Sequence, residues 1–186
     1  MPIGQVSFWN NKGDISCLGK KISDEVNKGH IVIMPFYKTQ LSTNSYDIRL
    51  GEKYIKYEDG IIDPKKPARY STHNIPKMGL NLKPGNFILG ESKEVIGSEH
   101  YVPMLHAKSG TARSGLFVHV TADLIDIGSV GKITFQLFAT LPVTVYPDML
   151  IGQMSFWVPD GEIELYNGKY QHSSGPMPSK TFLDYA

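Results

Sequence analysis

The chain has 186 residues, of which 41% are hydrophobic and 20% charged, and these values predict one folded domain with a buried core. The 19 Lys and Arg residues nearly balance the 18 Asp and Glu residues, whereas proteins that bind long nucleic acids usually carry a basic excess. No apolar run approaches the roughly 18 residues of a membrane helix, and the first residues lack the apolar segment of a signal peptide. One cysteine, Cys17, excludes an internal disulfide and a CxxC zinc site. We therefore expect a soluble cytoplasmic protein with no membrane or nucleic-acid partner.

One helix is predicted near the start of the chain. Residues Ile15–Lys28 place Leu18, Ile22 and Val26 on one face, and Gly29 follows as a helix stop.

After this helix the apolar pattern becomes that of short strands. Ile31–Ile33 form an apolar run, and Tyr46, Ile48 and Leu50 alternate with polar residues, as in a half-buried strand. Similar segments are Tyr54–Tyr57, Asn86–Leu89, Leu116–Val120, Lys132–Phe138, Val143–Tyr146 and Gln153–Val158. Turn sequences with Gly, Pro and Asp separate them. The pattern predicts a mainly β sandwich, jelly roll or barrel.

The C-terminal tail, residues 168–186, is rich in Ser, Pro and Lys and has no periodic apolar face. We expect it to become ordered only against another part of the protein. Because no linker or internal repeat divides the chain, residues 1–186 are predicted to form a single domain that includes this tail.

The segment AKSGTARSGL has the composition of a phosphate-binding loop. It brings Lys108, Ser109 and Arg113 close to the small residue Gly110. Small residues let the backbone approach a ligand, and basic side chains neutralise phosphate oxygens. A solvated turn with two incidental bases is the alternative.

The following segment contains two aspartates, Asp123 and Asp126, before the turn at Gly128. An aspartate at a strand end beside phosphate-binding residues has the chemistry to activate water or to hold Mg²⁺. Its alternative role is to cap the turn. The six histidines show no metal-ligand spacing, and the zinc deaminase signature is absent, which excludes deamination at a zinc site.

Four motifs resemble, in order and spacing, those of the dCTP deaminase family, whose sister group is the trimeric dUTPases. They are SYDIRLG (Ser45–Gly51), AKSGTARSGLFVHVTADLIDIG (Ala107–Gly128), DMLIGQMSF (Asp148–Phe156) and GKYQHSSGP (Gly168–Pro176). The resemblance implies a distorted β-barrel or jelly-roll subunit with a short N-terminal helix, assembled as a homotrimer. It also implies active sites between subunits, each closed by a C-terminal tail.

The resemblance further implies the residues that contact a deoxynucleoside triphosphate. Asp126 would lie by the deoxyribose and, in the dUTPase branch, orient the attacking water. Mg²⁺ would accompany the triphosphate without a direct protein ligand. The remaining implied contacts, to the phosphates, the base and from the tail, are Lys108, Ser109, Gly110, Arg113, Val120, Thr121, Ala122, Gln153, Tyr166, Lys169 and Tyr170.

The sequence departs from the family pattern at three positions. Gln136 stands where the deaminases have the glutamate that transfers protons, and an amide cannot accept a proton near neutral pH. Ser129 replaces an aromatic residue that packs on the sugar, and Ser173 replaces a glutamine of the tail.

We therefore expect, as the leading hypothesis, a hydrolase that cuts dUTP or a related pyrimidine nucleotide to the monophosphate and pyrophosphate. In it Asp126 orients water, while Arg113, Lys108 and Mg²⁺ neutralise charge. The alternatives are a dCTP deaminase that releases dUTP and ammonia, and a catalytically silent trimer that binds a nucleotide.

Overall fold

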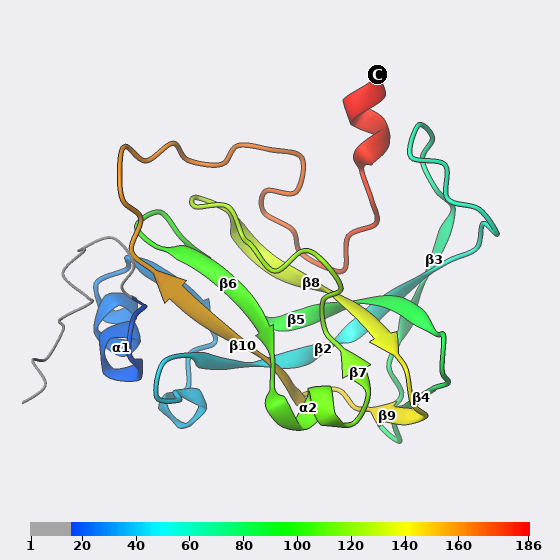
Figure 1. Ribbon diagram of the computed structural model, residues 1–186, viewed down its shortest axis with the longest axis horizontal. Helices are drawn as coiled ribbons and strands as arrows, with labels where there is room; N and C mark the ends of the chain where they lie inside the picture. The colour runs from blue at the N-terminus through cyan, green and yellow to red at the C-terminus, as the bar shows by residue number, and fades with distance from the viewer. Residues whose placement is uncertain (1–15) are drawn as a thin grey trace, which may run out of the picture.

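The computed structural model describes residues 16–186, and strands make up most of the regular structure (Figure 1). Within these residues the helices are α1 (Gly19–Asn27) and α2 (Ser109–Arg113), with the short 3₁₀ helices η1 (Lys38–Gln40) and η2 (Thr181–Tyr185). The strands are β1 (Ile31–Met34), β2 (Tyr46–Tyr57), β3 (Tyr70–Asn74), β4 (Leu80–Leu82), β5 (Phe87–Ser98), β6 (Val102–Ala107), β7 (Leu116–Phe117), β8 (Val130–Ala139), β9 (Val143–Val145) and β10 (Leu150–Trp157). The predicted mainly β fold is confirmed. No helix among residues 16–186 is long and apolar enough to span a membrane.

Eight strands form one antiparallel sheet that curls into a nearly closed barrel (Figure 1). Its main path is β6-β10-β2-β5-β8-β7, with β1 paired to β5 and β3 paired to β2, while β4 and β9 form a separate pair. The long strands β2 and β5 shift register after Leu50 and Glu91. Such irregularities bend a strand, which lets one strand serve two sides of the barrel. The barrel expected from the resemblance is confirmed, and the homotrimer stays a prediction.

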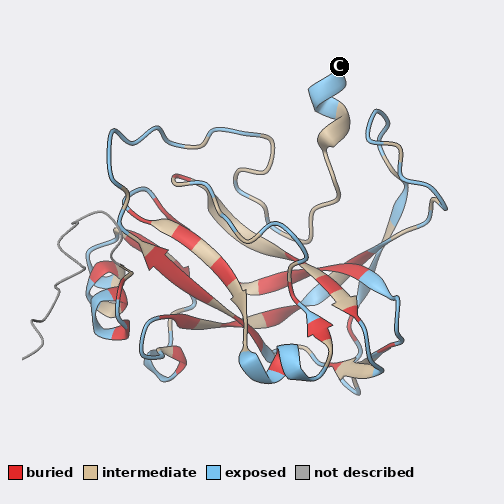
Figure 2. Ribbon diagram, viewed as in Figure 1, coloured by how far each residue is buried: buried red, intermediate tan, exposed pale blue. Residues whose placement is uncertain are grey.

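The core of the barrel follows the alternation of side chains along its strands (Figure 2). Tyr46, Ile48 and Leu50 of β2 are fully buried, as predicted. Phe135 and Leu137 of β8 are also fully buried. Complete burial of such a side chain contributes about 1.5–3 kcal/mol to folding. Because successive residues of a strand face opposite sides, Gln136, which lies between these two, points out of the core, toward the site described below.

The N-terminal helix is shorter than predicted. Its observed part begins at Gly19, and the predicted first residue, Ile15, lies outside the described residues. Leu18 is 60% exposed because its backbone is extended, so the prediction that it packs on the apolar face of the helix is wrong. Ile22 is fully buried, and Gly29, with φ of 76°, ends the helix as predicted.

The structure contains three strands that the sequence pattern does not predict: β3, β4 and β6. β3 is largely exposed and lacks an apolar face, and β6 contains Pro103, which argues against a strand in a sequence pattern. Both strands lie at edges of the sheet, where proline and polar residues are tolerated. The predicted strand Leu116–Val120 is reduced to the two residues of β7.

Candidate active site

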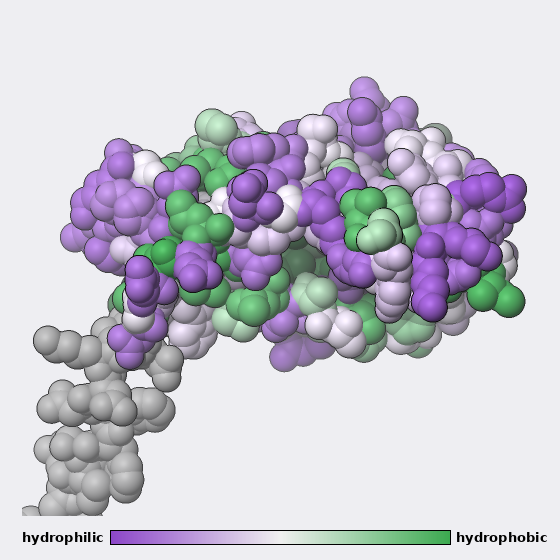
Figure 3. All heavy atoms as spheres, turned by 90° about the horizontal axis from the view of Figure 1, so that it is seen from above, coloured by the Kyte–Doolittle hydropathy of each residue, from purple (hydrophilic) through white to green (hydrophobic). Residues whose placement is uncertain are grey.

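A cavity of about 480 Å³ lies between β8, the segment that precedes it and the C-terminal residues. Five of the predicted site residues line it: Ala122, Asp126, Gln136, Tyr166 and Tyr170. Figure 3 views the molecule from the side of the C-terminal tail and shows apolar residues set among hydrophilic ones on this face. A concave, mostly apolar pocket with a few polar groups is the usual form of a small-molecule site.

Strand β8 supplies one wall of the cavity. Lys132, Thr134 and Gln136 line the cavity together with Ile133, whereas Phe135 and Leu137 face the core. The alternation that packs the barrel therefore also sets these three polar side chains in a row along one wall.

The side chain of Gln136 is oriented by the backbone of the neighbouring segment. The Val120 N–H donates a hydrogen bond of 3.2 Å, and only the amide oxygen Oε1 of Gln136 can accept it. The amide nitrogen Nε2 finds no acceptor among the described residues, so the NH₂ group is free to donate a hydrogen bond to a ligand. Val120 itself and Thr121 are exposed and do not line the cavity, although both were predicted to face the base.

Asp126 faces the cavity from the turn before β8. The turn is closed by the backbone, because the Ser129 N–H donates to the Asp126 carbonyl oxygen over 3.0 Å and Gly128 has φ of 90°. The Asp126 carboxylate makes no turn-capping hydrogen bond, so the alternative role of a turn cap is not what the structure shows. The carboxylate is thus available to a ligand.

The C-terminal tail lies along β8 as its next neighbour. The Lys132 N–H donates to the Ser173 carbonyl oxygen over 2.8 Å, and the Ser173 hydroxyl donates to the Lys132 carbonyl oxygen over 2.5 Å. The His172 N–H donates to Val130, and the Met177 N–H donates to the Thr134 hydroxyl. The tail therefore covers part of the cavity wall, and it brings to the cavity residues such as Met177 that the sequence did not single out.

A glycine on β8 makes room for this contact. A Cβ atom at Gly131 would lie 2.6 Å from Ser173 Oγ and 2.7 Å from the Ser173 backbone nitrogen. We predict that Gly131→Ala displaces the tail, because the clash involves backbone and not a flexible side-chain end. Trypsin cleavage after Lys169 and Lys180 should become faster. Gly60→Ala is the control, since no atom lies within 4 Å of the added Cβ there, and equal cleavage of the two variants would contradict the prediction.

Lys169 of the tail does not line the cavity. Its ammonium group is held by both oxygens of Asp184 at 2.5 Å. Tyr170, next to it, lines the cavity and accepts a hydrogen bond of 2.8 Å from the Lys180 N–H. The structure thus places only one of these two predicted tail residues at the site.

The predicted phosphate-binding residues form a second group away from the cavity. Ser109, Gly110 and Arg113 belong to α2, with Lys108 directly before it and Gln153 on the adjacent strand β10. In Figure 1, α2 lies at the bottom of the view and the C-terminal tail at the top. None of these five residues lines the cavity. Within one chain, the structure does not bring the two predicted halves of the site together.

The side chains of this second group are held by local contacts. Lys108 forms an ion pair with Asp47, which is mostly buried. The Ser45 hydroxyl donates to Gln153 Oε1 over 3.2 Å, and Gln153 Nε2 donates to the Ala107 carbonyl oxygen over 3.4 Å. Ser109, Gly110 and Arg113 remain exposed on α2. Arg113 and the other exposed residues of α2 therefore face the outside of the subunit.

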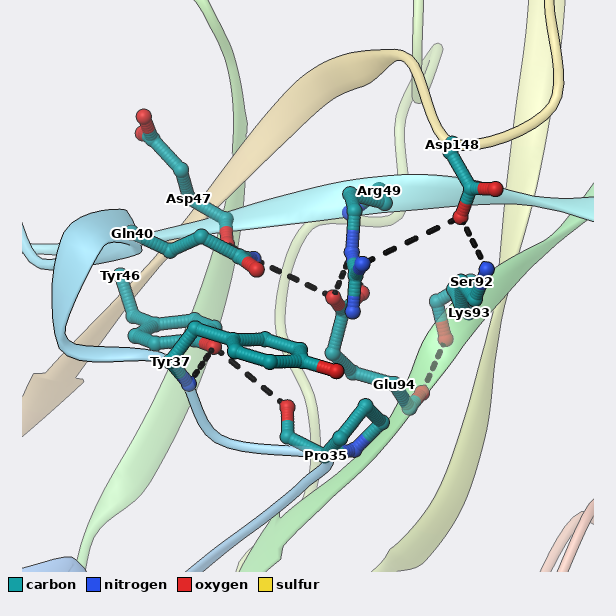
Figure 4. Close-up of polar contacts among 10 residues, drawn as sticks. All are labelled: Pro35, Tyr37, Gln40, Tyr46, Asp47, Arg49, Ser92, Lys93, Glu94 and Asp148. Atoms are coloured by element: carbon teal, nitrogen blue, oxygen red, sulfur yellow. Dashed lines mark hydrogen bonds and ion pairs between the residues drawn. The ribbon is translucent and has the colours of Figure 1, made fainter.

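A buried ion-pair network joins β2 to β5 near the barrel core (Figure 4). Glu94 is fully buried and accepts hydrogen bonds from Arg49 Nε at 2.6 Å and from Gln40 Nε2 at 3.2 Å. Asp148, next to Arg49, also pairs with Lys93. These contacts give Arg49 of the SYDIRLG motif a structural role between β2 and β5.

Comparison with known proteins identifies the relatives of this chain. Residues 17–158 match the dCTP deaminase-like family. A "dCTP deaminase, dUMP-forming" of Hathewaya histolytica is 40% identical over 168 residues, which cover 90% of this chain and 97% of that protein. A protein of the same name from Cytophaga hutchinsonii is also 40% identical, over 90% of this chain and 96% of its own.

A solved structure supports the fold. The 2′-deoxycytidine 5′-triphosphate deaminase from Agrobacterium tumefaciens has a TM-score of 0.63 to this chain at 17% sequence identity. The similarity covers 79% of this chain and 49% of that one, so this chain spans about half the length of the solved chain.

These relatives contradict the predicted leading activity. They are named for deamination of dCTP with formation of dUMP, and not for hydrolysis of dUTP. The prediction of a dUTP hydrolase is therefore wrong, and the deaminase alternative agrees better with the relatives. That prediction gave too much weight to Gln136. The amide removes one proton acceptor, but the similarity to the named deaminases extends over 90% of the chain.

Proposed function

This chain belongs to the dCTP deaminase-like family, and we propose that it converts dCTP to dUMP. The observation that carries the proposal is the cavity that joins the oriented amide of Gln136 to the carboxylate of Asp126. Two water molecules are consumed. One replaces the amine at C4 of the base and releases ammonia, and the other attacks phosphorus and releases pyrophosphate.

The Gln136 amide would recognise the base. Cytosine has two adjacent acceptors, O2 and N3, whereas uracil carries a proton at N3. The free NH₂ group of Gln136 therefore favours cytosine as its hydrogen-bond partner. Ala122, which also lines the cavity, leaves room beside the base.

Asp126 would act on the phosphate side of the nucleotide. It is the one carboxylate that lines the cavity among the described residues, and a carboxylate next to a phosphate can orient and deprotonate the attacking water. Positioning of the nucleotide and neutralisation of its phosphate charge would supply most of the remaining rate enhancement.

The nucleotide is expected to bind as its Mg²⁺ complex. No three His, Cys, Asp or Glu side chains lie together as a metal site within residues 16–186. Mg²⁺ at nucleotide sites is commonly held by substrate phosphates with few carboxylates, which fits a wall that offers Asp126 alone. The ion would neutralise phosphate charge.

We predict a homotrimer in which α2 of one subunit completes the cavity of the next. The separation of the α2 group from the cavity supports this arrangement, because Arg113, Lys108, Ser109 and Gln153 cannot reach a nucleotide in their own cavity. Sedimentation at micromolar concentration should give about three times the 20.7 kDa of one chain. A mass of one chain would contradict the prediction.

The activity is tested by incubating the protein with dCTP and Mg²⁺ and measuring ammonia, pyrophosphate and nucleotide products. The expected result is dUMP, with ammonia and pyrophosphate in equal amounts. Binding of dCTP without either product would overturn the proposal in favour of a silent nucleotide-binding protein.

A further inference from the structure

Deamination at this site needs a group that can transfer protons, and Gln136 cannot do so near neutral pH. Water must lose a proton as it attacks C4, N3 must gain one, and the departing amine must gain one. Among the described residues, the charged side chains that line the cavity are Asp126 and Lys132. Asp126 lies at the turn before β8, and Lys132 lies nearer to Gln136 along the strand.

Lys132 is paired with a buried carboxylate on the same face of the sheet. Glu91 of β5 is only 3% exposed, and its Oε2 lies 2.9 Å from Lys132 Nζ. This contact lacks hydrogen-bond geometry, so Oε2 has no hydrogen-bond donor among residues 16–186, while Oε1 accepts a 3.3 Å bond from the Lys53 N–H. A buried carboxylate with a single ammonium partner is costly to fold, which points to a functional reason for its presence.

The strand register shows in which direction Glu91 orients the ammonium group of Lys132. Glu91 lies opposite Thr134, and Leu89 lies opposite Gln136. Lys132 and Gln136 are four residues apart, about 13 Å along a strand, and Thr134 is halfway between them. By pairing with Glu91, Lys132 is directed along the wall toward Gln136, and a base held by the Gln136 amide would lie between the two side chains.

We infer that Lys132 is the proton-transfer residue of the deamination and that Glu91 is its positioning residue. This inference rests on the proposed function. Lys132 would carry out the proton transfer that Gln136 cannot, and Gln136 would recognise the base.

The step balances with one lysine. The Lys132 ammonium gives its proton to N3, and the resulting amine takes a proton from water as the oxygen–C4 bond forms. The ammonium then protonates the exocyclic amine, which leaves as ammonia when the C4–N bond breaks. The proton of the C4 hydroxyl returns to Lys132 as the C4 carbonyl forms. The cycle starts and ends with the Lys132 ammonium group beside the carboxylate of Glu91, with Nζ 2.9 Å from Oε2.

Lys132→Arg is the decisive variant because arginine keeps the charge and the ion pair but cannot release a proton. Ammonia release from dCTP should fall by about 10²–10⁴-fold, while the Kd for dCTP changes less than about tenfold. Lys66→Arg is the matched control, since Lys66 is exposed and its ion pair is with Asp63. A second variant, Glu91→Gln with Lys132→Met, removes both charges together, so no buried charge is left unpaired if the first variant folds poorly.

The outcomes separate this inference from the proposed function. A wild-type protein that binds dCTP but releases no ammonia overturns the proposed function and this role with it. A wild-type protein that deaminates, together with a Lys132→Arg variant or a double variant that deaminates equally fast, overturns only the role of Lys132. Loss of ammonia release in both variants, with dCTP binding retained, supports it.

Discussion

The Gln136→Glu substitution is expected to restore ammonia release to the Lys132→Arg variant, by about 10²-fold or more. Glutamate matches glutamine in size, and the Val120 N–H that now binds Oε1 at 3.2 Å would hold a carboxylate oxygen in the same place. The second oxygen would then take the position of Nε2 and face the base of the bound nucleotide. An apolar cavity wall raises the pKa of a carboxyl group, which suits a group that must both take and give protons. In the wild-type background the same substitution should raise the rate, because it adds a second proton acceptor.

The measurement is ammonia release from dCTP by the Lys132→Arg protein with and without Gln136→Glu. Gln136→Met in the same background is the control, since it removes the amide without adding a carboxylate. No recovery in a folded, dCTP-binding double variant would show that a missing proton acceptor is not what limits the reaction.

The Asp126→Asn substitution is expected to separate the two halves of the reaction. Pyrophosphate release should fall by about 10²–10⁴-fold, because asparagine cannot deprotonate the water that attacks phosphorus. Ammonia release should continue, so that dUTP accumulates in place of dUMP. Nucleotide affinity should stay within about tenfold, or about 1.4 kcal/mol, since the carboxylate acts on water and does not hold phosphate.

Chromatography of the nucleotide products tests this separation. Asp123→Asn is the matched control: Asp123 precedes Asp126 by three residues but does not line the cavity. Unchanged dUMP formation by the Asp126→Asn protein would exclude its role in the cleavage of the triphosphate. Equal losses of ammonia and pyrophosphate would show that Asp126 serves both steps.

The strands of the barrel could be predicted where one face of the strand is buried. Tyr46, Ile48 and Leu50 alternate with polar residues because the intervening positions leave the core, and the sequence pattern shows this directly. β3 is exposed and β6 contains a proline, so neither has such a pattern, and only pairing with a neighbouring strand defines it.

The cavity could be predicted only in part, for a similar reason. Asp126 and Gln136 belong to motifs that can be recognised along the chain, and both line the cavity. The pairing of Glu91 with Lys132 depends on the register of β5 against β8 and on the shift that follows Glu91. Neither can be derived from local sequence, in which Glu91 and Lys132 resemble ordinary surface residues of a strand.

The separation of α2 from the cavity has a consequence for mixtures of inactive variants. In the proposed trimer, a subunit that lacks Arg113 still carries an intact cavity, and a subunit that lacks Asp126 still carries an intact α2. Two inactive proteins that exchange subunits would therefore regain activity, because one carrying Arg113→Ala and the other Asp126→Asn can supply each other's missing part. In an even mixture about one site in four would combine two intact parts. A lesion in one copy of the gene for such an enzyme would be partly masked by a different lesion in a second copy.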